Sequence, residues 1–248
     1  MSFFRFPVAG NFDQNKDIEM MNNVKVIAFD GDDTLWINEP LFQQTEAEFC
    51  KLLAEMLPAE EVSARLFAHE MKNLPLYGYG IKGFTLCMLE TACEVAKERF
   101  DQRLAAEVLA LGKQLLQAPV ELIPGVEEVL AGLEGRYRLV LATKGDLLDQ
   151  ERKLRASGLS KYFHHIEVMS DKHAADYQKL IRHLDCAPEH FLMVGNSMKS
   201  DVIPVLSLNS HAVYIPFHVT WSHELHDGKG GTADFLELTQ ISELLQYL

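Results

Sequence analysis

Cysteine is scarce in this chain. Four cysteines occur among 248 residues, and no two of them form a CxxC pair. This spacing excludes the disulfide framework of a small secreted domain and the zinc motifs built from paired cysteines. We therefore expect reduced thiols and a cytoplasmic protein, in which Cys50, Cys87 and Cys93 serve as small apolar fill within helices.

Positive charge and long apolar runs are also lacking. Lysine and arginine number 23 against 36 acidic residues, which gives a formal net charge of −13. This charge argues against a general affinity for nucleic acid or anionic membranes. The longest apolar runs fall well short of the roughly 20 residues that a membrane helix needs.

The N-terminal apolar stretch is interrupted by Arg5 and Pro7, so we expect no signal peptide. Residues 1–22 are expected to form a loose extension, within which Met20 or Met21 could be an alternative translation start.

Internal repeats and low-complexity tracts are absent, and the chain instead alternates strand-like and helical patterns. The strand-like runs are 24–29, 138–142, 165–169, 191–194 and 212–215. Such alternation predicts a mostly parallel sheet covered by helices on both faces. The block 38–118 contains no convincing strand, although 74–80 breaks its helical series, and a closing helix is expected to begin at Ile241. We therefore predict an α/β core over 23–37 and 119–248, interrupted by an all-helical domain over 38–118.

Polar residues follow four of these strands. They are Asp30 and Asp32, Thr143 and Lys144, Asp171 and Lys172, and Gly195-Asn196 with Asp201. Because parallel strands bring their carboxyl ends to one edge of the sheet, these residues can converge. Two carboxylates at i and i+2 beside apolar residues repel each other and raise one another's pKa. A protein retains such a pair where a cation or a reaction uses it.

In this order, the four groups resemble the motifs of the haloacid dehalogenase superfamily of hydrolases. The motifs are a strand followed by Asp30-x-Asp32-x-Thr34, a strand ending in Thr143, then Lys172, and then Gly195-Asn196 with Asp201. The resemblance covers 24–215, and the helical block falls where this family places its cap. It implies a Rossmann-like three-layer core and a Mg²⁺-dependent phosphatase that acts on a small phosphorylated metabolite. We expect a monomer or a homodimer.

The resemblance also assigns roles to residues. Asp30 is the implied nucleophile, which forms an aspartyl-phosphate, and Asp32 is the implied general acid and base. Lys172 would neutralise phosphoryl oxygens, and the Thr143 hydroxyl would donate to one of them. Lys144 either contacts phosphate or substrate or is an ordinary surface lysine.

A magnesium site is implied at the same place. Mg²⁺ prefers oxygen ligands, and the implied ones are the Asp30 and Asp201 carboxylates with the backbone carbonyl of Asp32. The family's fourth motif often reads Gly-Asp, whereas this chain has Asn196 after the glycine. The Asn196 amide still offers an oxygen, but one negative charge is lost. We therefore expect weaker Mg²⁺ binding or a shifted metal preference.

Three other functions stay open. A phosphotransferase of the sugar-phosphate mutase type would keep both aspartates. A 2-haloacid dehalogenase needs neither an acid at Asp32 nor a metal at Asp201, so these residues argue against it. A non-catalytic phosphate-binding module is suggested by Asn196.

Two loops and one histidine pair complete the candidates. Segment 77–83 is either a loop that faces the site or a turn between helices. The segment that holds His218, His223 and His226 is interpreted as a loop over the mouth of the site, because its spacing matches no familiar zinc pattern. His164 and His165 are interpreted as an ordinary strand entry.

Overall fold

The core of the molecule is a six-stranded parallel sheet. The computed structural model describes residues 21–224 and 235–248. The strand order is β3-β2-β1-β4-β5-β6. The strands are β1 (Val26–Phe29), β2 (Arg138–Lys144), β3 (His165–Met169), β4 (Phe191–Gly195), β5 (His211–Tyr214) and β6 (Leu236–Glu237). The first five confirm the sequence prediction, and β6 was missed because two residues are too short to show an alternating pattern.

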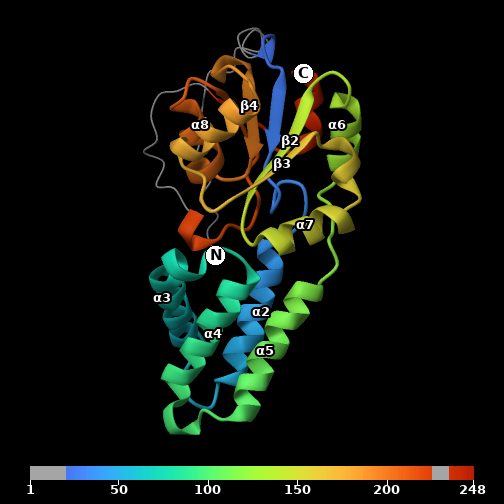
Figure 1. The fold of residues 1–248 in the computed structure, drawn as a ribbon. Helices are drawn as coiled ribbons and strands as arrows, with labels where there is room; N and C mark the ends of the chain where they lie inside the picture. Colours follow the sequence, from blue (N-terminus) through green and yellow to red (C-terminus); the bar gives the residue numbers. More distant parts are fainter. Residues whose placement is uncertain (1–20, 225–234) are drawn as a thin grey trace, which may run out of the picture.

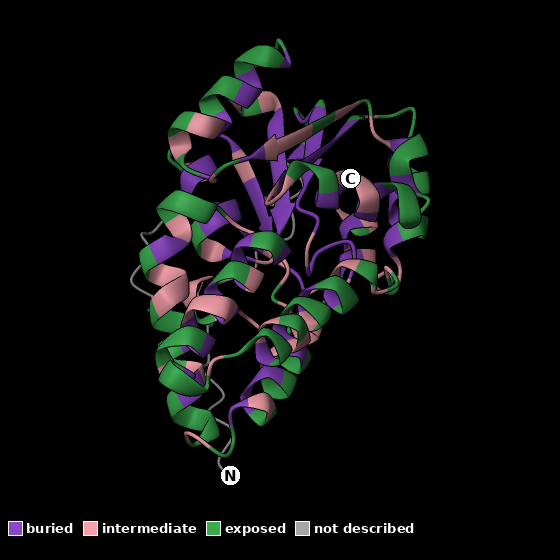
Figure 2. Cartoon of the chain, turned by 60° about the horizontal axis from the view of Figure 1, so that its bottom comes forward, coloured by how far each residue is buried: buried purple, intermediate pink, exposed green. Residues whose placement is uncertain are grey.

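Helices cover both faces of this sheet, as predicted (Figure 1). One face packs against α6 (Val126–Leu133), α7 (Leu147–Ala156) and the 3₁₀ turn η6 (Ile241–Gln246). The other face packs against α8 (Ala174–His183) and α9 (Ile203–Leu206). Alternate residues of each strand serve the two faces, so β1 and β4 are buried throughout and β2 is buried except at its ends (Figure 2). The remaining short turns are η1 (Lys97–Arg99), η2 (Leu159–Tyr162), η3 (Pro188–His190), η4 (Met198–Val202) and η5 (Ser222–Glu224).

Four helices between β1 and β2 form a separate hydrophobic cluster, at the lower end of the molecule in Figure 1. They are α2 (Glu39–Leu52), α3 (Ala59–Tyr77), α4 (Ile81–Ala96) and α5 (Gln102–Gln117). Their centre is apolar and buried, and its fully buried members include Phe49, Leu66 and Met88. No helix among the described residues is long and apolar enough to cross a membrane.

Several local expectations were wrong. Helix α3 continues through Pro75 to Tyr77, because a proline near a helix end removes one hydrogen bond without stopping the last turn. The closing helix from Ile241 is a 3₁₀ helix. Met21 is buried in the sheet cluster, although it was assigned to a loose extension, whose residues 1–20 lie outside the described range. Cys93 is exposed, and only Cys50 and Cys87 serve as buried fill.

Candidate active site

The carboxyl ends of the central strands open into a cavity of ≈ 170 Å³ between the sheet and the helical block. Strand order reverses between β1 and β4, the position where open α/β sheets bind ligands. Most of the predicted site residues line this cavity, namely Asp30, Asp32, Lys144, Lys172, Asn196 and Asp201.

A buried ion-pair triad lies at the base of the cavity. Lys172 Nζ donates to Asp30 Oδ1 at 2.5 Å and to Asp201 Oδ1 at 2.7 Å. Burial raises the pKa of Asp30 to about 7, with Asp201 adding to the rise and Lys172 opposing it. Burial alone would lower the pKa of Lys172, but Asp201 and Asp30 hold it above its ordinary value. Lys172 is therefore a fixed positive charge beside the candidate nucleophile.

Asp201 is presented by an irregular turn after β4. This turn, η4, is a π-helical turn, a feature often found at functional sites. A Cβ on Gly195 would lie 2.3 Å from Asp201 Cγ, so only glycine admits this carboxylate so close to the strand end. The Ser197 backbone N–H donates to Asp201 Oδ2 at 3.0 Å and fixes its orientation.

Asp32 is held by three donors. Its Oδ1 accepts from Trp36 Nε1 at 2.6 Å and from Lys153 Nζ at 2.8 Å, and its Oδ2 accepts from Gln150 Nε2 at 2.9 Å. Trp36 is itself fully buried beside this carboxylate. Sequence reasoning missed Lys153 and Gln150, because a lysine in a helix is ordinarily solvated, whereas the Lys153 side chain turns inward to Asp32.

The Thr143 hydroxyl is buried, and no described residue satisfies it. It lies 3.2 Å from the position that a Cβ on Gly31 would occupy, directly behind the loop that carries Asp30 and Asp32. Thr143 does not itself line the cavity. An unpartnered buried hydroxyl costs free energy, so a ligand oxygen near the Gly31 loop would satisfy it.

Lys144 is held by other residues in the site. Its Nζ forms an ion pair with Glu224, donates to Ser200 Oγ at 2.9 Å and lies 4.4 Å from the centre of the Tyr79 ring. Burial would raise the pKa of Glu224, but Lys144 and hydrogen bonds from Ser197 and Ser200 lower it to about 2. Sequence reasoning missed Glu224, which carries no motif.

Asn196 lies against the oxygens implied as metal ligands. With its amide nitrogen inward it donates to Asp30 Oδ2 at 3.2 Å and to the Asp32 carbonyl at 3.3 Å. With its oxygen inward it accepts from Thr34 Oγ1 at 3.1 Å. The Asp32 carbonyl, the Asp30 carboxylate and the Asn196 amide are therefore close neighbours.

Both loops reach the cavity. Only residues 78–80 separate α3 from α4, so the segment is a turn between helices, and Tyr77, Gly78, Tyr79 and Gly80 line the cavity. Trp221 and Glu224 line it from the segment after β5, as a loop over the mouth would. The histidines of this segment do not gather around a common point among the described residues. His223 contacts Lys199, and His218 is exposed. His226 lies outside the described residues.

Asp33 is a structural residue that neighbours the site. It accepts hydrogen bonds from the backbone N–H groups of Asn38 and Glu39, at the start of α2. Burial raises the pKa of Asp33 to about 7. The third aspartate of the first motif therefore connects the sheet to the helical block.

Comparisons with known proteins agree with this arrangement. Residues 24–204 match the family model of haloacid dehalogenase-like hydrolases. A solved structure, a haloacid dehalogenase-like family hydrolase from Xanthomonas campestris, is 38% identical, with a TM-score of 0.80 and 90% of each chain covered. The chain belongs to the haloacid dehalogenase-like hydrolase family.

More distant relatives include phosphatases and dehalogenases. A curated relative, the glyceraldehyde 3-phosphate phosphatase of Methanothermobacter thermautotrophicus, is 26% identical over 132 residues, which are 50% of this chain and 58% of that protein. The match thus spans just over half of that relative's length. The HAD-hydrolase YfnB from Bacillus subtilis, bound to magnesium, is 18% identical, with a TM-score of 0.62 and coverage of 91% of this chain and 98% of its own. 2-Haloacid dehalogenases share the fold at 13–18% identity.

Proposed function

We propose that this protein is a Mg²⁺-dependent phosphatase that acts on a small phosphorylated metabolite through an aspartyl-phosphate at Asp30. The observation that carries the proposal is the buried Asp30–Lys172–Asp201 triad at the base of the cavity. A lysine fixed between two carboxylates supplies the positive charge that a carboxylate needs in order to approach a phosphate dianion.

The reaction follows from these positions. Asp30 attacks phosphorus, the new Asp30–phosphorus bond forms, and the bond to the leaving oxygen breaks. Asp32 gives a proton to the departing alkoxide and then takes one from the water that attacks the acyl-phosphate. Trp36, Lys153 and Gln150 orient Asp32 for this role, and Thr143 donates to a phosphoryl oxygen.

The donor set at the site suits magnesium. The Asp30 and Asp201 carboxylates, the Asp32 carbonyl and the Asn196 amide oxygen are all oxygen donors, as Mg²⁺ prefers. Bound there, the ion would neutralise charge on the phosphoryl oxygens and on Asp30. Asn196 contributes no charge, so we expect weaker Mg²⁺ affinity than an aspartate would give.

The helical block restricts the leaving group. Its end of the cavity is lined by Glu39, Glu46 and Glu70, beside Phe42 and Phe84. Burial, with repulsion from neighbouring glutamates, raises the pKa of Glu70 to about 8, and burial with repulsion from Asp33 raises that of Glu39 to about 7. A leaving group with a second anionic group would be repelled, increasingly so as these carboxyls ionise. We therefore propose neutral or cationic leaving groups, of which the glyceraldehyde released from glyceraldehyde 3-phosphate, the compound named for the relative, is a neutral example.

The activity is tested with p-nitrophenyl phosphate and a panel of metabolites. We expect Mg²⁺-dependent phosphate release that Asp30→Asn abolishes, and no chloride release from 2-chloropropionate. Phosphate release that is unchanged in Asp30→Asn, or independent of Mg²⁺, would overturn the proposal.

The leaving-group preference is tested separately. We compare kcat/KM for glyceraldehyde 3-phosphate with kcat/KM for phosphoglycolate. The ratio of the first to the second should rise from pH 6 to pH 9. At pH 9, Glu70→Gln should reduce this ratio by about tenfold, or about 1.4 kcal/mol. The control is Glu107→Gln, a partly exposed glutamate on α5 that pairs with Arg103 and lies outside the cavity lining. A ratio that does not change with pH, or that changes equally in both variants, would contradict the role of Glu70.

A further inference from the structure

A second group of metal-ligating side chains lies away from the cavity. It consists of His165 and Glu167 on β3 and His183, the last residue of α8. His165 opens β3, so it lies at the amino end of the strand, whereas the catalytic candidates follow the carboxyl ends. The proposed phosphatase reaction makes no use of these residues.

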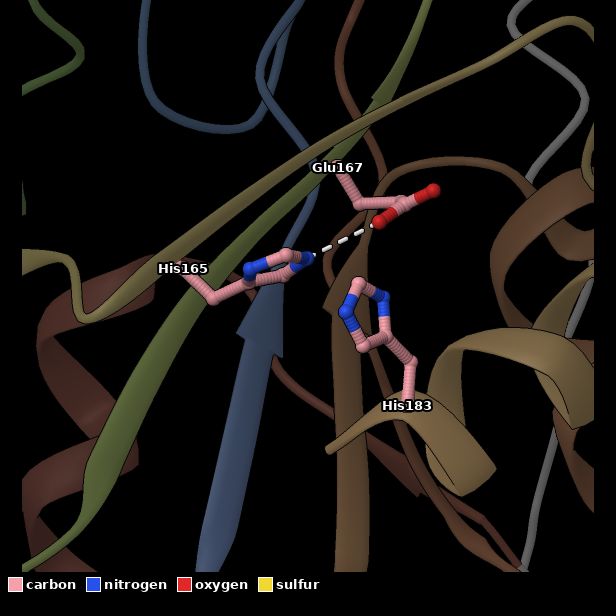
Figure 3. A group of neighbouring side chains, drawn as sticks. All are labelled: His165, Glu167 and His183. Carbon is pink, nitrogen blue, oxygen red and sulfur yellow. Dashed lines mark hydrogen bonds and ion pairs between the residues drawn. The ribbon is translucent and has the colours of Figure 1, made fainter. Parts of the chain in front are cut away.

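Their geometry is that of an open ligand set. One nitrogen of each histidine and one oxygen of Glu167 all lie within 4.8 Å of one another. His165 Nε2 contacts Glu167 Oε2 at 2.8 Å, and the two imidazole centroids are 5.1 Å apart at an interplanar angle of 73°. Figure 3 shows the carboxylate and both rings turned toward a common space between β3 and the end of α8.

The fold itself places these side chains together. His165, Glu167 and Met169 occupy alternate positions of β3 and therefore point to the same face of the sheet. Met169 is buried on that face among Tyr177, Leu180 and Ile181 of α8. The packing of Met169 thus directs His165 and Glu167 toward α8, whose last residue is His183.

The site is reachable from solvent. The side chains of His165 and Glu167 are 28% and 33% exposed, and His183 is exposed. Because β3 is an edge strand, one side of the group stays open to water molecules that would complete a coordination shell.

We infer that this group is a second divalent-metal site, distinct from the magnesium site, that takes a transition metal such as Zn²⁺. Two imidazoles and one carboxylate are ligands that Zn²⁺ and Co²⁺ accept, with water at the fourth tetrahedral position, whereas Mg²⁺ prefers oxygen alone. A bound ion ties β3 to α8, the two elements whose connecting loop carries Lys172. Its role is to stabilise this unit without contact to the cavity.

Zinc titration by calorimetry of the full chain in excess Mg²⁺ tests the site. We expect one Zn²⁺ per chain with micromolar affinity, and a rise in melting temperature of about 5–10 °C at a hundredfold excess over Kd. His183→Ala and His165→Ala should each weaken this binding at least about tenfold. Co²⁺ should give a tetrahedral absorption spectrum that the same variants remove.

The matched control is His69→Ala. His69 also contacts glutamates, but its Nδ1 faces Glu90 and its Nε2 faces Glu94, so opposite edges of one ring are engaged. We expect zinc affinity to be unchanged in this variant. Equal zinc affinity in the wild type and His183→Ala, or loss of binding in His69→Ala, would overturn the inference. Since His183 is exposed, its replacement leaves the fold intact and decides the question even if His165→Ala does not fold.

Discussion

Replacing Lys172 with methionine removes the cation that joins Asp30 to Asp201. The lysine side chain is 1% exposed and donates to both carboxylates. Without it, two buried carboxylates face each other with no positive charge between them. Loss of one partner from a buried ion pair typically costs about 3–5 kcal/mol, which we expect at pH 8.

The loss of stability that Lys172→Met causes should depend on pH. Burial already raises the pKa of Asp30 to about 7 with the lysine present, and removing the lysine raises it further. A carboxyl whose pKa is higher in the folded than in the unfolded state favours folding at low pH, and this contribution is lost as pH rises through the folded pKa. At pH 5.5 Asp30 is protonated in the variant, so the cost should fall to about 1–2 kcal/mol.

Urea unfolding of wild type and Lys172→Met at both pH values measures this difference. Thermal unfolding at pH 8 should show the corresponding fall in melting temperature, about 10 °C at about 2–4 °C per kcal/mol for a chain of this size. Lys161→Met is the control, because Lys161 is 60% exposed, pairs with the exposed Glu127 and lies over the Tyr162 ring without touching the cavity. An equal loss of stability at pH 5.5 and pH 8, or none at either, would refute the reasoning.

Two further predictions concern neighbouring contacts. Gly31→Ala should sharply lower kcat with a smaller loss of stability. The added Cβ would lie 2.7 Å from the Trp36 ring and 3.2 Å from Thr143 Oγ1, so the Asp30–Asp32 loop would have to shift. A normal kcat in steady-state kinetics would contradict this close fit. Glu224→Gln should lower the free energy of unfolding by about 2 kcal/mol at neutral pH. The pKa of Glu224 in the folded protein is lowered to about 2, so the ionised carboxylate stabilises the fold at pH values above its unfolded pKa. This stabilisation is lost as pH falls through the folded pKa. Urea unfolding should therefore show the wild-type advantage shrinking between pH 5 and pH 2, and an advantage that persists at pH 2 would contradict the ion-pair account.

The sequence alone predicted the elements whose patterns are local. Strands such as 191–194 are continuous apolar runs between turns, and the aspartates at their ends lie at fixed offsets from them. Because parallel strands share one edge, the convergence of Asp30, Lys172 and Asp201 follows from strand order without any knowledge of side-chain contacts.

Side-chain partners that depend on tertiary packing were not predictable. Lys153 and Lys144 each have an ordinary surface interpretation, and only the docking of α7 and the segment after β5 turns them toward Asp32 and Glu224. His165, interpreted as a strand entry, gains its neighbours from the end of α8, which is 18 residues away in sequence. The two-residue strand β6 lacks a pattern of its own.

The most direct test of the central claim is the covalent intermediate itself. Enzyme quenched in acid during turnover of a phosphate ester with Mg²⁺, then reduced with borohydride and digested, should carry homoserine at position 30 and at no other aspartate. Asp32→Asn should still form the phosphorylated enzyme but hydrolyse it slowly, so the modified fraction should rise. Modification at another residue, or turnover with no trapped intermediate in either protein, would contradict the role assigned to Asp30.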